Sequence, residues 1–168
     1  MNSRKICMVG AFAVGKTSLV RQFVESLFSE KYHTTIGVKI DKRVVEVKGE
    51  PVQLIIWDIE GVDIFTELKP SYLRGASGII LVMDGTRYNT LTATRQVMEI
   101  VEKSIGATNF VLLINKHDLI SEWQIKDEHL ISLGIDEKNI FKTSAKTGDN
   151  VEAAFKRLAE LILSPGLI

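Results

Sequence analysis

Residues 10–17 read Gly10-Ala11-Phe12-Ala13-Val14-Gly15-Lys16-Thr17. This stretch follows a short apolar run at residues 6–9 and precedes a segment of helical periodicity at residues 16–27. It fulfils the Gly-x-x-x-x-Gly-Lys-Thr pattern in the strand-to-helix context that the pattern requires. Average residue usage gives an accidental match in on the order of one in a few hundred chains of this length. The stretch therefore predicts a phosphate-binding loop, or P-loop.

The residue types in this loop explain how it would hold phosphate groups. Its two glycines let the backbone curl so that N–H groups point at phosphate oxygens, and the following helix adds its dipole. Lys16 is expected to neutralise the β- and γ-phosphates, and the Thr17 hydroxyl is expected to coordinate Mg²⁺. Further contacts to a nucleotide are expected at Ala13, Val14, Gly15 and Ser18. The alternative is a glycine-containing turn with a surface lysine.

Around the loop, apolar runs alternate with segments of helical periodicity. The runs have the length of strands buried on both faces of a sheet, and they cover residues 6–9, 52–57, 78–83 and 110–114. The helical segments cover residues 16–27, 91–104, 123–133 and 150–163. This alternation predicts parallel β-α-β units and a doubly wound α/β sheet with helical layers on both sides.

Two features refine this architecture. Residues 38–47 alternate in polarity and reach the next strand through residues 48–51, which predicts a hairpin with an antiparallel edge strand. Pro70 suits the first turn of a short helix, where its missing N–H is not needed.

Length and charge limit the class of protein. The 168 residues are enough for one domain, residues 1–168, with a single sizeable core. The 21 basic residues equal the 21 acidic ones, so the formal net charge is zero. Overall electrostatics therefore favours neither nucleic acid nor an anionic membrane as a partner.

The cysteine content and the lack of targeting segments indicate the cellular compartment. Cys7 is the single cysteine and lies in an apolar run, so it is expected to be a buried hydrophobic residue in a reducing compartment. Without a signal peptide or about 18 uninterrupted apolar residues, the sequence predicts a cytoplasmic protein. Asn2 excludes myristoylation, and residues 163–168 show no cysteine for a lipid anchor. Either the chain is trimmed or a protein partner determines its location.

A second motif supplies candidate metal ligands. Asp58 ends a predicted strand, at a position where an aspartate would hold Mg²⁺ directly or through water. Together with Gly61 it forms an Asp-x-x-Gly spacing, in which the glycine N–H can sense a γ-phosphate. Alone, a strand-ending aspartate is common in turns.

Two further motifs predict a site for a base. Asn115-Lys116-His117-Asp118 follows the strand at residues 110–114, and Thr143-Ser144-Ala145-Lys146 follows a strand candidate at residues 139–141. A carboxylate can accept hydrogen bonds from N1–H and the exocyclic amine of guanine, whereas adenine offers the wrong donors. Asp118 is therefore expected to select guanine. An adenine-nucleotide kinase or ATPase is disfavoured by this residue and by the absence of an obvious second substrate domain.

In this order, the motifs resemble the small GTPases of the Ras superfamily from end to end. Thr35-Ile36-Gly37-Val38 and Tyr72-Leu73-Arg74-Gly75-Ala76 are most similar to the Rab branch. The resemblance implies a P-loop NTPase fold with a six-stranded, mostly parallel sheet, about five helices and two nucleotide-sensing switches. It also implies GTP or GDP with Mg²⁺ as cofactors, and a role in signal transduction or vesicle trafficking.

The resemblance also assigns roles to individual residues. Thr35 would contact Mg²⁺ and the γ-phosphate, Phe28 would pack beside the base, Lys116 would cover its face, and the Ala145 N–H would meet the guanine oxygen. Phe28 as ordinary core and Thr35 as a loop hydroxyl remain open alternatives. The base site would be completed by Asn115, Asp118, Ser144 and Lys146. The metal ligands would be Thr17, Thr35 and Asp58, and the catalytic residues Lys16, Thr35 and Gly61.

The sequence departs from this family at two positions. Val62 stands where a glutamine usually orients the attacking water, and valine forms no hydrogen bond through its side chain. Phe12 stands where glycine is frequent, and its ring is expected to obstruct an arginine finger. Both changes predict slow GTP hydrolysis, or hydrolysis by groups not yet identified. Glu60 and Asp63 are candidate replacements, although a negative group near the γ-phosphate is unfavourable.

Partners are expected at the switch loops. Ile40, Trp57 and Tyr72 match an aromatic-rich surface that binds effectors in Rab-like proteins, although Ile40 replaces a usual phenylalanine. The alternative is that these residues line the sheet edge. The sequence thus leaves two functions: a monomeric regulatory GTPase that meets effectors and regulators, or a GTP-bound scaffold without turnover that acts as a binding module.

Overall fold

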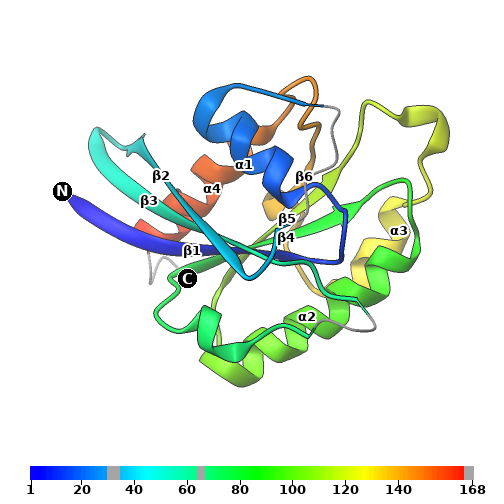
Figure 1. Cartoon of the computed structure of the whole chain (residues 1–168), viewed down its shortest axis with the longest axis horizontal. Helices are drawn as coiled ribbons and strands as arrows, with labels where there is room; N and C mark the ends of the chain where they lie inside the picture. Colours follow the sequence, from blue (N-terminus) through cyan, green and yellow to red (C-terminus); the bar gives the residue numbers. More distant parts are fainter. Residues whose placement is uncertain (30–34, 64–66, 165–168) are drawn as a thin grey trace.

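A six-stranded sheet forms the centre of the molecule, in the strand order β2-β3-β1-β4-β5-β6 (Figure 1). The computed structural model describes residues 1–29, 35–63 and 67–164. The strands are β1 (Asn2–Gly10), β2 (Val38–Val47), β3 (Glu50–Ile59), β4 (Gly78–Asp84), β5 (Asn109–Asn115) and β6 (Ile140–Lys142). Only the β2–β3 pair is antiparallel among these strand pairs. The predicted mostly parallel α/β sheet with an antiparallel edge strand is confirmed.

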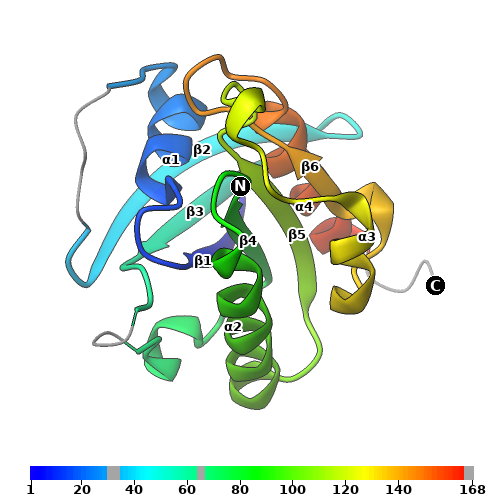
Figure 2. The same ribbon diagram turned by 90° about the vertical axis from the view of Figure 1, so that its right-hand side faces the viewer.

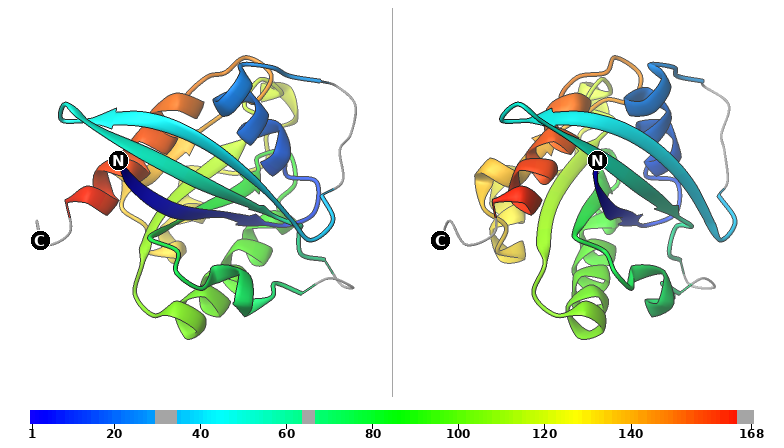
Figure 3. Two further views of the ribbon diagram at one scale, coloured as in Figure 1. Left: turned by 60° about the vertical axis from the view of Figure 1, so that its left-hand side comes forward. Right: turned by 90° about the vertical axis from the view of Figure 1, so that its left-hand side faces the viewer.

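Burial explains why the strands differ in composition. Every residue of the inner strand β4 is buried, because helices cover both of its faces. In contrast, buried, half-buried and exposed residues are interspersed along the edge strand β2. Its hairpin with β3 closes through Lys48 and Gly49, which both have positive φ, as a two-residue hairpin turn requires. Figure 3 shows this long hairpin along one side of the molecule.

Helices form a layer on each side of the sheet. They are α1 (Lys16–Glu25), α2 (Asn89–Ile105), α3 (Asp127–Leu130) and α4 (Val151–Leu163). Helices α1 and α4 share one hydrophobic core with the sheet, and α2 and α3 contribute to a second core on its other face. In the first core Phe23 of α1 stacks on Phe155 of α4 with ring centroids 4.0 Å apart. Figure 2 shows α2 against the sheet, where it packs on β4.

The segment at residues 123–133 differs from the prediction of one helix. Only the four residues of α3 are α-helical, and residues 131–133 form a 3₁₀ turn. Trp123 and Lys126 have extended backbones. Trp123 packs against the second core and Ile125 is 4% exposed, so residues two apart face inward. This inward spacing belongs to an extended chain rather than to a helix.

Smaller elements complete the fold. The segment beginning at Pro70 is the 3₁₀ turn η1 (Pro70–Leu73), so the predicted short helix is present as a tighter turn. The described residues contain four α-helices instead of about five, and three other 3₁₀ turns: η2 (Ile120–Glu122), η3 (Ile131–Leu133) and η4 (Glu137–Asn139). None of the helices in the described ranges is long and apolar enough to cross a bilayer.

Cys7 is fully buried in β1, as its apolar neighbours predict. Burial raises the pKa of its thiol to about 12, and the charge of Lys5 offsets only part of this effect. The thiol therefore stays protonated and unreactive near neutral pH. Of residues 163–168, in which the sequence shows no cysteine for a lipid anchor, residues 165–168 lie outside the described residues.

Candidate nucleotide-binding site

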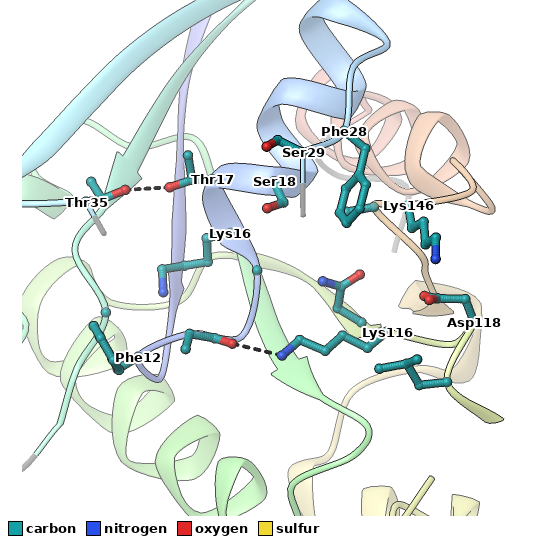
Figure 4. Close-up of a pocket in the computed structure, with 16 residues that line it drawn as sticks. Phe12, Lys16, Thr17, Ser18, Phe28, Ser29, Thr35, Lys116, Asp118 and Lys146 are labelled. Carbon is teal, nitrogen blue, oxygen red and sulfur yellow. Dashed lines mark hydrogen bonds between the residues drawn. The ribbon is translucent and has the colours of Figure 1, made fainter. Parts of the chain in front are cut away.

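A cavity of about 370 Å³ opens beside the loops that follow β1, β3, β5 and β6 (Figure 4). These loops come from the carboxyl ends of the strands, where open α/β sheets bind ligands. The lining residues are Phe12, Ala13, Gly15, Lys16, Thr17, Ser18, Phe28, Ser29, Thr35, Gly61, Asn115, Lys116, Asp118, Leu119, Ala145 and Lys146. The structure thus gathers segments from the P-loop to residue 146 around one space.

Most residues predicted to contact the nucleotide line this cavity, and two do not. Val14 is fully buried in the core, and Ser144 is buried with its hydroxyl bonded to Asp118. Conversely, Ser29 and Leu119 line the cavity without having been predicted. Each directly follows a predicted residue in the chain, and this adjacency was the available signal. Parts of both expected switch loops, residues 30–34 and 64–66, lie outside the described residues.

The P-loop owes its shape to left-handed backbone positions held from outside. Gly15 has φ of 101°, and a Cβ there would lie 2.4 Å from Nδ2 of Asn115. The same amide nitrogen donates a hydrogen bond of 3.0 Å to the carbonyl of Val14, and Nζ of Lys116 donates one of 3.2 Å to the carbonyl of Ala13. Because these side chains occupy the two carbonyls, the opposite edges of the same peptide groups can present N–H groups to an anion.

Lys16 lies at the phosphate end of this cavity and is 6% exposed. Its Nζ donates hydrogen bonds to the carbonyls of Gly10 at 3.3 Å and Ala11 at 3.0 Å. Burial lowers the pKa of Lys16 to about 8, although the charge of Asp58 opposes this effect. An anion in the cavity would favour the charged form of the lysine. The position suits a phosphate group.

The three predicted metal ligands meet at one point. The Thr17 hydroxyl oxygen lies 2.5 Å from that of Thr35 and donates a hydrogen bond of 2.6 Å to Oδ2 of Asp58. Figure 4 shows Thr17 and Thr35 pointing toward each other. Asp58 is fully buried, and its Oδ1 has no hydrogen-bond partner among the described residues.

This set of oxygens fits a hard divalent cation. Burial raises the pKa of Asp58, and the Thr17 hydrogen bond and the Lys16 charge counteract that effect. A cation beside the unpartnered oxygen would stabilise the carboxylate further. The described residues contain no group of three or more His, Cys, Asp or Glu side chains that could bind a metal. Few carboxylates suit Mg²⁺ that is shared with phosphate groups and water.

At the other end of the cavity, hydrogen bonds fix the predicted base-binding residues. The Ser144 hydroxyl donates to Oδ1 of Asp118 at 2.8 Å, which orients a carboxylate that is otherwise open to the cavity. The Thr143 hydroxyl donates to Oδ1 of Asn115 at 3.2 Å. Phe28 is 39% exposed and lines the same cavity, so it is not an ordinary core residue.

The residues after Asp58 are joined to the P-loop. Val62 forms an isolated parallel bridge with Ala11: its N–H donates to the Gly10 carbonyl at 3.1 Å, and its carbonyl accepts from the Phe12 N–H at 3.0 Å. A Cβ at Gly61 would lie 2.6 Å from Cα of Phe12, so only glycine fits this approach. The Val62 side chain packs on the second core. Val62 therefore serves as a packing residue of this loop.

Glu60 is engaged by another loop. Its carboxylate accepts a hydrogen bond of 2.9 Å from the Gly37 N–H, and its own N–H donates to the Gly37 carbonyl at 2.8 Å. The Glu60 carboxylate is therefore bonded to Gly37, in the segment that follows Thr35. Phe12 is 40% exposed and lines the cavity, as expected for a ring at its mouth.

The residues expected to meet partners lie on β2, β3 and η1. Ile40 is 48% exposed and faces Trp57 in the β2–β3 register. The ammonium of Lys5 lies 3.6 Å from the centre of one Trp57 ring. Tyr72 and Trp57 are both partly buried against the second core. Ile40 is thus available to a partner, whereas Trp57 and Tyr72 also pack within the domain.

A doubly wound sheet with a glycine loop between its first strand and first helix is the architecture of P-loop nucleotide-binding domains. The sequence model of the Ras family matches residues 5–164. Ras-related protein Rab-13 of Canis lupus familiaris is 35% identical over 161 residues, which cover 95% of this chain and 79% of that protein. The GTP-binding protein ypt1 of Schizosaccharomyces pombe is 34% identical over 163 residues, covering 94% and 79%. The chain belongs to the Ras family, near its Rab branch.

Proposed function

We propose that this protein is a molecular switch that binds GTP or GDP with Mg²⁺ and hydrolyses GTP slowly. The observation that carries the proposal is the carboxylate of Asp118, oriented by Ser144, at one end of the cavity that has the P-loop at its other end. A carboxylate so placed selects guanine through two donors on one edge of the base. Membership of the Ras family supports the same conclusion.

The residues of the cavity divide the nucleotide between them. The N–H groups of residues 13–18 and the ammonium of Lys16 would bind the phosphates, and Phe28, Lys116, Ala145 and Lys146 would enclose the base. Thr17, Thr35 and Asp58 would hold Mg²⁺, which neutralises charge on the β- and γ-phosphates when bound. The Gly61 N–H would sense the γ-phosphate, so that Thr35 and Gly61 order the two switch loops for an effector.

Slow turnover follows from the residues beside the γ-phosphate position. Val62 offers only its backbone, and both its N–H and its carbonyl are bonded to the P-loop. The carboxylate of Glu60, one of the two candidate replacements for the glutamine, accepts a hydrogen bond from the Gly37 N–H. Because phosphoryl transfer depends on positioning, we expect an intrinsic rate at or below the value of about 10⁻⁴ per second typical of the family's reference protein.

A second function is supported by the same contacts. If Val62 and Phe12 prevent hydrolysis altogether, the domain would act as a GTP-bound scaffold that presents Ile40, Trp57 and Tyr72 to a protein partner. A role in vesicle trafficking belongs to the proposal through the similarity to the Rab branch. The monomeric state, the cytoplasmic location and the protein partners expected from the sequence remain predictions.

Two measurements on the purified protein test the proposal. In the first, GDP, GTP and ATP compete for the site with Mg²⁺ present. We expect GDP and GTP to displace each other and ATP to displace neither. Displacement by ATP would contradict the guanine assignment of Asp118.

In the second measurement, single-turnover GTP hydrolysis is followed for the native protein, for Val62→Gln and for the control Val44→Gln, which changes an exposed valine of β2. We expect Val62→Gln to hydrolyse GTP at least about tenfold faster than the other two, because the amide can orient water. Rapid hydrolysis by the native protein would show that another group positions the water. No hydrolysis by any of the three would favour the scaffold.

A further inference from the structure

A buried carboxylate outside the predicted motifs lies next to the P-loop. Asp84, the last residue of β4, is fully buried, and both of its oxygens are occupied. Oδ1 accepts hydrogen bonds from the Thr86 N–H at 2.9 Å and the Thr86 hydroxyl at 2.6 Å. Oδ2 lies 2.7 Å from Nζ of Lys116 and 3.0 Å from Nε of Arg87. One carboxylate therefore organises two cations.

Both cations extend from this carboxylate to consecutive carbonyls of the P-loop. Nη2 of Arg87 donates a hydrogen bond of 2.7 Å to the Phe12 carbonyl, and Nζ of Lys116 donates one of 3.2 Å to the Ala13 carbonyl. Ala13 has φ of 62°, a left-handed conformation that is unfavourable for a residue with a Cβ. The two cations hold the carbonyls on either side of this strained position.

We infer that Arg87 is a positioning residue of the nucleotide site, which clamps the Phe12 carbonyl to Asp84 and thereby fixes the phosphate-binding N–H groups of the P-loop. The inference rests on the proposed function, since it concerns how the same site holds phosphate. Through Asp84 the clamp also joins the P-loop to Lys116 of the base-binding motif. Arg87 itself does not line the cavity, and Lys116 would keep its own contacts to Asp84 and to the Ala13 carbonyl without it.

The chemistry of arginine suits this role better than that of lysine. The guanidinium uses Nε for Asp84 and Nη2 for Phe12, so one rigid group satisfies two acceptors in fixed directions. A lysine would bring one ammonium to both acceptors with less directional control. Arg87 lies in no nucleotide-binding motif, so the sequence alone carries no sign of this function.

The electrostatics of the cluster agrees with its geometry. Burial alone would raise the pKa of Asp84, but hydrogen bonds from Lys116 and Thr86 outweigh burial and keep it below its ordinary value. The carboxylate is therefore charged throughout the neutral range and holds both cations. The Arg87 side chain is 37% exposed. Water can thus replace it at the Phe12 carbonyl, so we expect Arg87→Ala to fold.

The test compares Arg87→Ala and Arg87→Lys with the native protein and with the control Arg95→Ala. Arg95 is an exposed arginine of α2 whose guanidinium donates to the Ser132 hydroxyl, away from the cavity. Hydrogen exchange of the P-loop amides is measured first, on protein without nucleotide. We expect exchange about tenfold faster in Arg87→Ala, an intermediate rate in Arg87→Lys and the native rate in Arg95→Ala.

Nucleotide binding supplies a second readout. We expect GDP release about tenfold faster in Arg87→Ala, whereas guanosine, which has no phosphate, binds native protein and Arg87→Ala equally within about twofold. A residue that only stabilised the fold would weaken both ligands alike. Partial rescue of GDP release by Arg87→Lys would support a charge-assisted clamp.

The outcomes separate this inference from the proposed function. If the native protein binds no GDP, both are overturned. If the native protein binds GDP and Arg87→Ala matches it in exchange and in release, the inference alone is overturned. Faster exchange of β4 and β5 together with the P-loop would assign Arg87 a structural role and would also overturn the inference.

Discussion

The two ends of the cavity are built differently. At the base end, Asp118 and Asn115 carry the expected motif, and Ser144 and Thr143 fix each of them by a hydrogen bond. At the γ-phosphate end, Val62 replaces the water-orienting glutamine and is bonded to the P-loop through its backbone. We therefore expect nucleotide binding and GTP turnover to depend on separate residues of the cavity. One end can be complete while the other is altered.

The largest expected effect removes the feature on which the base end depends. In Asp118→Ala the guanine donors lose a charged acceptor, and hydrogen bonds to charged groups contribute about 1.5–3 kcal/mol each. We therefore expect the GDP dissociation constant to rise by at least about a hundredfold, as measured by calorimetry. The control Asp136→Ala removes an exposed aspartate that accepts from the Lys138 N–H, and it should bind GDP normally. Near-native affinity in Asp118→Ala would place base recognition elsewhere.

The base end was predictable because its signals are local in sequence. Each motif directly follows a strand, and parallel strands bring their carboxyl ends to one edge, so the sequence predicts that residues 10–17, 115–118 and 143–146 lie together. The motifs also predict Val14 and Ser144 as nucleotide contacts, and both side chains are buried. Their burial depends on packing that the motifs do not encode.

Features that depend on contacts between distant segments were missed. Helical periodicity at residues 123–133 was misleading, because Trp123 and Ile125 both turn toward the second core. The engagement of Glu60 by Gly37 joins two loops that are 23 residues apart. The contact between Arg87 and Phe12 spans 75 residues. Such pairs follow from the topology of the sheet and from no local pattern.

A second prediction concerns the cation that we propose at the γ-phosphate end of the cavity. In Thr17→Ala the cation would lose one oxygen ligand, whereas Thr17→Ser keeps the hydroxyl. We expect chelation with EDTA to accelerate GDP release about tenfold in the native protein and in Thr17→Ser, and to have little effect in Thr17→Ala, which already releases GDP quickly. Release is followed with a fluorescent GDP analogue.

Thr108→Ala serves as the matched control for this measurement, because Thr108 lies in the loop between α2 and β5, away from the cavity. It should respond to EDTA as the native protein does. If EDTA leaves native GDP release unchanged, the cluster of Thr17, Thr35 and Asp58 does not hold a cation that supports the nucleotide.

The smallest expected effect concerns Glu60. It tests whether this carboxylate takes the place of the glutamine that Val62 replaces. Glu60→Ala removes the charged acceptor of the Gly37 N–H. Both residues are half-buried, so water can replace this acceptor, and we expect the loss to be smaller than the about 1.5–3 kcal/mol of a shielded hydrogen bond to a charged group. We expect the Gly37 amide to exchange about fivefold faster. The control Glu46→Ala changes an exposed residue of β2 and should leave this rate as it is.

Glu60→Gln separates the two roles that a carboxylate could have here. The glutamine oxygen can still accept from the Gly37 N–H, but the neutral amide cannot take a proton from water. Because Glu60 is bonded to Gly37, we expect Glu60→Gln to match the native protein both in the slow exchange of the Gly37 amide and in the rate of GTP hydrolysis. If the Gly37 amide of Glu60→Gln exchanges as slowly as in the native protein, but Glu60→Gln and Glu60→Ala both hydrolyse GTP more slowly than the native protein, the carboxylate acts on the water. The γ-phosphate end would then have a substitute for glutamine, and the contrast with the base end would disappear.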